Sequence, residues 1–333
     1  MLIEAEPHMS PRRFQIQAVD RTLTIGGSPL LMGVLNASPE SFSDGSRVGD
    51  VGRQLERAAQ LLEDGADLID IGGESAVTNE AAVPVADEIE RVCPLIEQVA
   101  GTLGAVVSVD TYKPEVAAAA IGAGAVIVND VSGLRDVALA DVCARTNAAL
   151  VLMHTLAAPK RRLQDPRRYQ DVAADVAAFL GRRMQVALER GVAMESLILD
   201  PGPDFAKTPA QTVRLLRRVE DLHALGRPLL IAVSRKDFIG ALTGRLPSQR
   251  LAGTLAAVGH CVDAGGHILR VHDVAAARDF LTVRGALRGD VEVDDSLVLD
   301  EAIRHERGRD VTDPARSPRR TPRHVPPASS AAG

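Results

Sequence analysis

Short apolar runs alternate with longer segments of helical spacing along most of the chain. The apolar runs predict buried strands at 30–35, 67–71, 105–109, 125–129, 148–153, 196–199, 228–233 and 266–271. The segments between them predict helices at 51–65, 86–100, 115–123, 137–146, 170–190, 209–219, 249–264 and 273–284. Several strands follow a glycine that can end a helix in the left-handed conformation, as Gly65 and Gly124 do.

The alternation predicts an α/β fold, and its size favours a closed (β/α)8 TIM barrel. Eight strand–helix units in about 250 residues are typical of that barrel. An open doubly wound sheet is the alternative, but it would usually have fewer strands and a glycine-rich first turn. The segment after the first strand, NASPESFSDG, has no G-x-G-x-x-G pattern. Residues 14–27 alternate like a short β-hairpin, which could close the N-terminal end of the barrel.

The composition and charge of the chain indicate what kinds of molecule it binds and where it is located. The 333 residues are 46% apolar and carry a net charge of −6, which does not favour nucleic acid. No apolar run approaches the length of a membrane span, and the N-terminus lacks the apolar stretch of a signal peptide. Cys93, Cys143 and Cys261 lie far apart, as expected for buried thiols in a reducing compartment. We therefore expect a cytoplasmic protein whose partners are small molecules, with no nucleic acid and no membrane.

Four regions are expected along the chain. Residues 1–13 form an N-terminal extension, 14–287 the barrel, and 288–304 an acidic C-terminal extension. Residues 305–333 are rich in Arg and Pro and poor in large apolar side chains. Such a segment cannot bury enough surface to offset its ordering entropy, so a disordered tail is predicted.

Polar or ionisable residues stand at the end of every predicted strand. In order they are Asn36, Asp70, Asp110, Asn129, His154, Asp200, Lys236, and Arg270 with His272. A single Asp or Asn at such a position is explained by capping of the next helix. The repeated mixture of amides, carboxylates and basic groups is not, and the C-terminal ends of barrel strands are where active sites form. The sequence therefore predicts a site at this rim.

The rim residues divide into two chemical groups. Closure of the barrel makes the first and eighth strands neighbours, so Asn36 should lie beside Arg270 and His272. This group suits a phosphate or diphosphate, and Asn36 is also a candidate Mg²⁺ ligand. The second group suits a flat heterocycle with several N–H groups and a carbonyl. Its members are Asp110, Asn129, Asp200 and Lys236.

Eight segments in chain order resemble the dihydropteroate synthase family of pterin-binding barrels. They are MGVLNASPESFSDG, DLIDIGGES, VSVDTYKPEVA, VNDVSG, VLMH, LDPGPDFAKTP, SRKDFIG and RVHDV, between residues 32 and 274. The resemblance implies a transferase of folate biosynthesis that condenses 6-hydroxymethyl-7,8-dihydropterin diphosphate with p-aminobenzoate or a related arylamine. Its products are 7,8-dihydropteroate and pyrophosphate. It also implies a Mg²⁺ cofactor and a homodimer.

The resemblance further implies a role for each matched residue. Asn36, Arg270 and His272 would hold the diphosphate and its Mg²⁺. The pterin ring would be held by Asp110, Asn129, Asp200 and Lys236, with Met153 against its face. Lys236 would also reach the arylamine, which Phe205 and Ser234 would border.

The loop after the first strand would close over the site and exclude water. In this interpretation Phe42 lies beside the arylamine and Asp44 near the developing cation. Asp44, Lys236, Arg270 and His272 are then the expected catalytic residues. The alternative is that Phe42 only anchors the loop to the rim.

Two loops depart from the family pattern. After GGES the usual Thr-Arg-Pro-Gly is Ala-Val-Thr-Asn at 76–79, and the usual Gly-Phe-Gly-Lys is Asp-Phe-Ala-Lys at 204–207. The added carboxylate of Asp204 would repel the carboxylate of p-aminobenzoate unless it points outward. Both changes fall on the arylamine half of the site. The altered loop at 76–79 is the best support for the alternative of a non-catalytic pterin-binding paralogue. A methyltetrahydrofolate-dependent methyltransferase, which shares the barrel but has no diphosphate to hold, is the other alternative.

Overall fold

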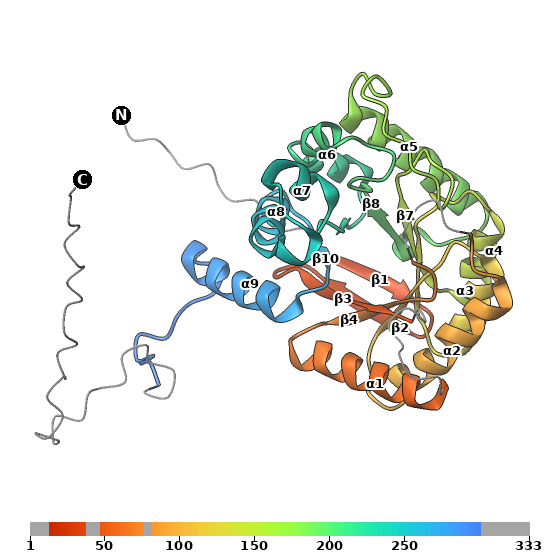
Figure 1. The fold of residues 1–333 in the computed structure, drawn as a ribbon, viewed down its shortest axis with the longest axis horizontal. Helices are drawn as coiled ribbons and strands as arrows, with labels where there is room; N and C mark the ends of the chain where they lie inside the picture. Colours follow the sequence, from red (N-terminus) through yellow and green to blue (C-terminus); the bar gives the residue numbers. More distant parts are fainter. Residues whose placement is uncertain (1–12, 38–46, 76–80, 301–333) are drawn as a thin grey trace, which may run out of the picture. The chain divides into compact units, whose positions relative to one another are not determined.

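Eight parallel strands form the centre of the fold in the computed structural model (Figure 1). The structure describes residues 13–37, 47–75 and 81–300, without the side chains of 47–50. Along the sheet the strands follow the order β8-β7-β6-β5-β4-β3-β10-β9. Their bounds are β3 Leu30–Asn36, β4 Leu68–Gly72, β5 Val107–Asp110, β6 Ile127–Asp130, β7 Ala149–Met153, β8 Leu197–Asp200, β9 Leu230–Ile231 and β10 Ile268–Val271.

A parallel bridge between Leu199 and Leu229 joins β8 to the residue before β9, so the two edges of the sheet meet. The backbone N–H of Leu199 also donates to the carbonyl of Pro228 at 3.0 Å. The predicted (β/α)8 barrel is therefore confirmed. The predicted strand at 228–233 is reduced to the two residues of β9, because its later residues leave the sheet to form the rim.

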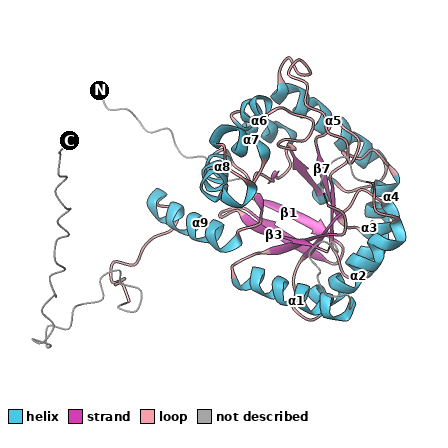
Figure 2. Ribbon diagram, in the orientation of Figure 1, coloured by secondary structure: helices cyan, strands magenta, loops and turns pink. Residues whose placement is uncertain are grey.

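Helices surround the strands (Figure 2). They are α1 Arg47–Glu63, α2 Val85–Gly101, α3 Pro114–Gly122, α4 Ala138–Thr146, α5 Val172–Glu189, α6 Pro209–Leu216, α7 Asp237–Thr243, α8 Leu251–Asp263 and α9 Val274–Arg288. Helix α6 ends earlier than expected and is followed by a 3₁₀ segment, Val219–Leu225. Helix α7 was not predicted, because seven residues are too few to display a helical period. Among the described residues, no helix is long and apolar enough to cross a membrane.

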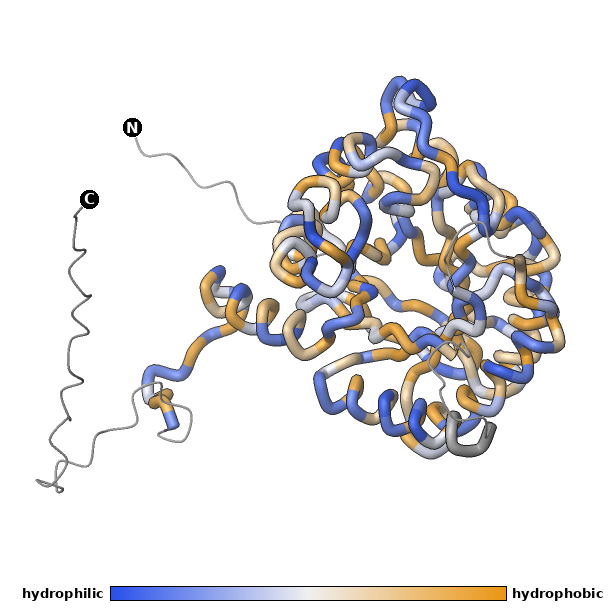
Figure 3. Tube along the Cα trace, viewed as in Figure 1, coloured by the Kyte–Doolittle hydropathy of each residue, from blue (hydrophilic) through white to orange (hydrophobic). Residues whose placement is uncertain are grey.

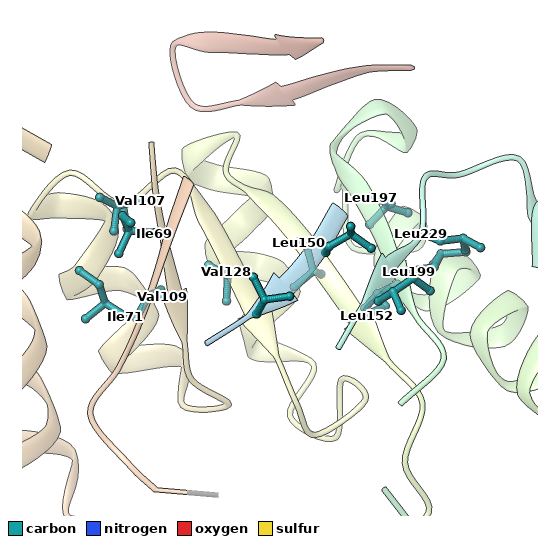
Figure 4. Packing of buried hydrophobic residues seen from close by; sticks show 14 of the residues in the cluster. Ile69, Ile71, Val107, Val109, Val128, Leu150, Leu152, Leu197, Leu199 and Leu229 are labelled. Carbon is teal, nitrogen blue, oxygen red and sulfur yellow. The ribbon is translucent and has the colours of Figure 1, made fainter. Parts of the chain in front are cut away.

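Alternate residues of each strand pack outward against the helices. The outer cluster includes strand residues such as Ile69, Val109 and Leu150 (Figure 4). Helix residues such as Leu61 and Leu95 belong to the same cluster. Figure 3 shows hydrophobic and hydrophilic residues interleaved along the surrounding helices, as expected where one face packs inward and the other meets water. This layer buries the largest part of the core.

The inner faces of the strands begin with an apolar layer at the N-terminal end of the barrel. The layer includes Met32, Leu68, Ile127, Val151, Ile198, Leu230 and Ile268. The hairpin of β1 (Phe14–Ala18) and β2 (Arg21–Ile25) adds its own buried residues Ile16, Ala18 and Ile25 to the same cluster. The hairpin thus closes this end of the barrel, and the open end is the one that carries the polar strand termini.

The chain divides into two units at Arg284 and Gly285. In the second unit, α9 ends at Arg288, and residues 289–300 form neither helix nor strand. Their apolar side chains, including Val293 and Leu297, are exposed. The expected boundaries at 287 and 304 stay predictions, and the tail at 305–333 lies outside the described residues.

Truncation of Ile16 to Ala should lower the free energy of unfolding by about 2–4 kcal/mol, because a fully buried isoleucine is replaced by a cavity. Urea denaturation followed by circular dichroism measures the change. The matched control is Thr22→Ala, an exposed position of the same hairpin. Equal, small effects of the two substitutions would contradict the role of the hairpin in closing the barrel.

Candidate active site

Strand periodicity carries polar side chains into the barrel above the apolar layer. Residues two positions apart point to the same face of a strand. Leu68 and Asp70 therefore share the inner face of β4, and Ile198 and Asp200 share that of β8. The same spacing brings Asn129 of β6, Arg270 of β10 and Ser108 of β5 inward. The predicted gathering of polar groups at one end of the barrel follows directly from this alternation.

The guanidinium of Arg270 lies between two carboxylates. Its Nε donates to Asp70 Oδ2 at 2.6 Å, and its Nη2 donates to Asp110 Oδ2 at 2.7 Å. Asn129 Nδ2 donates to the same oxygen of Asp70 at 3.1 Å. Side chains from β4, β5, β6 and β10 thus form one hydrogen-bonded cluster. Arg270, which the sequence grouped with the diphosphate residues, is thus bonded to Asp110 of the heterocycle group.

Burial governs the acids of this cluster. It raises the pKa of Asp110 above the ordinary range, and Arg270 opposes the shift while Asp70 adds to it. Burial also raises the pKa of Asp200, opposed first by the N–H of Gly202, which donates to Oδ1 at 2.7 Å. Asp70 is fully buried, and its Oδ1 has no hydrogen-bond partner among the described residues. The cluster therefore offers carboxyl groups that can bond a polar heterocycle.

Lys236 and Phe205 face each other across two loops. Lys236 is the residue before α7, and its Nζ lies 4.3 Å from the centroid of the Phe205 ring. This is a cation–π geometry. Burial lowers the pKa of Lys236, while Asp204 and Asp200 favour its charged form. Lys236 therefore connects the acids inside the barrel with an aromatic side chain at the rim.

Ser234 and His272 form a second pair on neighbouring strand ends. Ser234 Oγ accepts the backbone N–H of His272 at 3.2 Å and lies 2.9 Å from its Nδ1. The hydroxyl therefore fixes the orientation of the imidazole. Burial, together with the positive charges of Arg270 and Arg235, lowers the pKa of His272 to about 4. His272 is thus neutral near pH 7.

Asn36 ends β3, which pairs with β10 as predicted from closure of the barrel. Its side chain is exposed at the rim, whereas Met153 at the end of β7 is buried. Among the described residues, no three His, Cys, Asp or Glu side chains form a group that could hold a metal ion. Phe42 and Asp44 lie outside the described residues, as does the divergent loop at 76–79.

Asp70, His154 and Lys207 were given no functional role from the sequence. Asp70 was noted only as a strand end, although its inward position follows from its spacing to Leu68. Lys207 is fully buried, and its Nζ lies 2.8 Å from His154 Nδ1. Burial lowers the pKa of Lys207 to about 7 and that of His154 to about 2. No local pattern distinguishes a buried loop lysine from a solvated one.

Comparison with known proteins identifies the family of this chain. Residues 32–272 match the family described as pterin binding enzyme. A dihydropteroate synthase of Streptococcus pyogenes serotype M3 is 40% identical over 266 residues, covering 79% of this chain and 97% of that protein. A Xanthomonas albilineans dihydropteroate synthase with 4-aminobenzoic acid superposes with a TM-score of 0.76 at 42% identity, covering 84% and 99% of the two chains. The same enzyme in complex with 7,8-dihydropteroate gives a TM-score of 0.74 at 42% identity, covering 82% and 98%. The chain therefore belongs to the dihydropteroate synthase family of pterin-binding enzymes, transferases of folate biosynthesis.

Proposed function

We propose that the chain joins 6-hydroxymethyl-7,8-dihydropterin diphosphate to p-aminobenzoate, giving 7,8-dihydropteroate and pyrophosphate. The single observation that carries the assignment is the Arg270 cluster with Asp70 and Asp110 inside the open end of the barrel. The relatives from Xanthomonas albilineans bound to 4-aminobenzoic acid and to 7,8-dihydropteroate support the same pair of substrates. In the reaction, the bond from the exocyclic carbon to the diphosphate oxygen breaks. The arylamine nitrogen then bonds that carbon and loses a proton.

The pterin is proposed to lie inside the barrel against Met153, with its N–H edge on Asp110 and Asp200. Asn129 supplies an amide to the same ring. Each charge-assisted hydrogen bond of this kind contributes about 1.5–3 kcal/mol. Support comes from Asp70 beside them, whose buried Oδ1 has no hydrogen-bond partner among the described residues, since buried polar groups are stable only with partners.

The diphosphate is proposed to lie at the rim, near His272, Arg270 and Asn36. Mg²⁺ in such sites takes one or two protein oxygens and completes its shell with substrate phosphates and water. The exposed amide of Asn36 fits that pattern better than a closed set of acids would. The cation would neutralise charge on the departing diphosphate, while Arg270 and His272 orient it. We also propose that the loop with Phe42 and Asp44 excludes water from the site.

The arylamine is proposed to lie between Phe205 and Lys236, beside Ser234. The aromatic face of Phe205 and the aliphatic stem of Lys236 suit a flat ring, and the ammonium suits its carboxylate. The divergent residues 76–79 would border this half, so the choice of arylamine is the feature most open to change. A methyltetrahydrofolate-dependent methyltransferase would have no diphosphate to hold, and a non-catalytic paralogue would bind the pterin without turnover.

A homodimer and a cytoplasmic location complete the proposal. An apolar hollow on α6, α7 and α8 is lined by Val213, Leu216, Ile239 and Leu242, and Leu242 is 69% exposed. A patch of this kind is typical of a surface that pairs with another subunit. The cytoplasmic location rests on Cys93, Cys143 and Cys261, which are free thiols.

Mixing the enzyme with the pterin diphosphate, Mg²⁺ and p-aminobenzoate should release pyrophosphate, and omission of the arylamine should prevent release beyond slow hydrolysis. A coupled phosphate assay over a panel of arylamines measures the rate and defines the acceptor. Chelation of Mg²⁺ should lower the rate about tenfold or more, because the leaving charge loses its counter-ion.

Calorimetry with the same diphosphate separates the remaining outcomes. Tight binding without turnover on any arylamine would identify a non-catalytic paralogue. Affinity that is equal for the diphosphate and for free hydroxymethylpterin would favour the methyltransferase alternative.

Replacement of His272 by Asn should weaken the acid sensitivity of the fold. Because the pKa of His272 falls from 6.5 to about 4 on folding, the unfolded chain binds a proton between these values that the folded chain does not. The free energy of unfolding therefore decreases as pH falls through this window. Urea titrations between about pH 4.5 and 7 give the slope of the free energy of unfolding against pH. In the variant this slope should be smaller by the uptake of about one proton. An unchanged slope would contradict the buried, neutral imidazole.

Leu242→Asp should shift the protein from dimer to monomer in sedimentation equilibrium, because a charge enters the apolar hollow. Leu287→Asp, which changes a more exposed leucine on α9, is the control and should leave the state unchanged. A monomeric wild-type enzyme would remove the dimer from the proposal.

A further inference from the structure

The loop between β8 and α6 holds an unfavourable backbone conformation. Gly202, Asp204 and Ala206 have φ of +63°, +66° and +52°, in the left-handed region that side chains with a Cβ rarely adopt. At Gly202 a Cβ would clash with the carbonyl oxygen of His154, so glycine is required there. Strain of this kind persists only where surrounding contacts determine the conformation. The contacts of this loop should therefore be strong and specific.

From the barrel interior, Lys207 holds the loop. Its Nζ donates to the carbonyls of Gly202 at 2.8 Å and of Phe205 at 3.0 Å. The hydroxyl of Tyr169 donates to the carbonyl of Ala206 at 3.0 Å. Three carbonyls of the loop, those of Gly202, Phe205 and Ala206, thus accept hydrogen bonds from buried side chains. They fix the backbone around Phe205 but do not connect it to Lys236.

The link to Lys236 comes from Asp204. The Thr212 hydroxyl on α6 donates to Asp204 Oδ1 at 3.0 Å and lies 3.1 Å from the Asp204 backbone N–H, which donates to it. The backbone N–H of Phe238 in α7 donates to Oδ2 at 3.1 Å. Both carboxylate oxygens are therefore bonded to the two helices. The carboxylate that the sequence suggested would repel the arylamine is instead held by these donors.

Asp204, with its hydrogen bonds to Thr212 and Phe238, forms a bridge between α6 and α7. This bridge lies next in sequence to the two side chains that flank the proposed arylamine position. Asp204 precedes Phe205, and Phe238 lies two residues after Lys236. Lys236 stands at the N-cap position of α7, but its side chain does not bond the first N–H groups of the helix. The carboxylate of Asp204 accepts the N–H of Phe238 instead. The bridge thereby sets the 4.3 Å approach of Lys236 Nζ to the Phe205 ring. The charged or titratable groups that face Lys236 are Asp204, Asp200, Arg270, Asp110, Lys207 and His272.

We propose that Asp204 is a positioning residue for the arylamine half of the site, acting with Thr212 to hold Phe205 and Lys236 at a fixed separation. It contacts neither reacting atom. The pterin half depends mainly on Asp110, Asn129 and Asp200, which the bridge does not touch, and Lys236 is the one group that the two halves share. Loss of the bridge should therefore weaken use of the arylamine while sparing the pterin diphosphate. The inference rests on the proposed function, since it takes that arylamine site as given.

Asp204→Asn and Thr212→Val test the bridge in the full-length enzyme, alone and combined. Asn tolerates positive φ and keeps the shape of Asp, and Val is close in shape to Thr. Each single variant should raise the KM for p-aminobenzoate about tenfold, because a small displacement of positioning groups has large kinetic effects. The double variant should be no worse than the poorer single variant, as expected for residues that act as one unit. The Kd of the pterin diphosphate, from calorimetry, should stay within about twofold of the wild type.

Asp171→Asn is the matched control. Asp171 is also a capping carboxylate, on α5, but it pairs with Arg218 rather than facing Lys236. It should change neither constant. Equal losses for arylamine and pterin diphosphate, or additive effects of the two substitutions, would assign Asp204 a purely structural role.

A measurement without turnover separates this inference from the proposed function. In NMR titration of lysine side-chain resonances, Asp204→Asn should lower the pKa of Lys236, because the largest favourable charge is removed. An unchanged pKa would overturn the bridge. Absence of pyrophosphate release by the wild type would overturn the proposed function alone.

Discussion

The pairing of Arg270 with Asp70 and Asp110 is the interaction on which the rest of the site depends. These residues come from β10, β4 and β5, which are separated along the chain but close together around the barrel. A buried guanidinium without these carboxylates would carry a large desolvation cost, and so would the carboxylates without it. The cluster is therefore stable only when the barrel is closed with all three strands in register. The geometry of the candidate site and correct folding are in this way the same requirement.

The two ends of the barrel divide the work between stability and chemistry. At the closed end the hairpin and the inner apolar layer exclude water. At the open end the same inner faces carry charged groups, whose pKa values burial shifts in opposite directions for acids and bases. This arrangement leaves polar groups available to hydrogen-bond a ligand. One of them is Asp70 Oδ1, which has no partner among the described residues.

The loop that carries Phe205 shows how a departure from a family pattern can be absorbed. Asp204 and Ala206 occupy positions with positive φ, where glycine would be unstrained. Hydrogen bonds from Thr212, Phe238 and Lys207 hold the loop in that conformation. An acidic residue introduced beside a site for an anionic substrate need not repel it, provided that neighbouring donors hold the carboxylate.

The sequence by itself determined the strand–helix order and the end of the barrel where the polar groups gather. Both follow from local periodicity, since apolar runs alternate with helical segments and polar residues such as Asp70 and Asp110 stand at the strand ends. Eight matched segments were also enough to indicate the family. Only the tertiary structure decided which polar groups meet. Arg270 bonds two acids, Lys207 is buried against His154, and Asp204 joins two helices, of which α7 was not expected. Such contacts depend on long-range closure of the chain and on burial, and neither is written in the spacing of neighbouring residues.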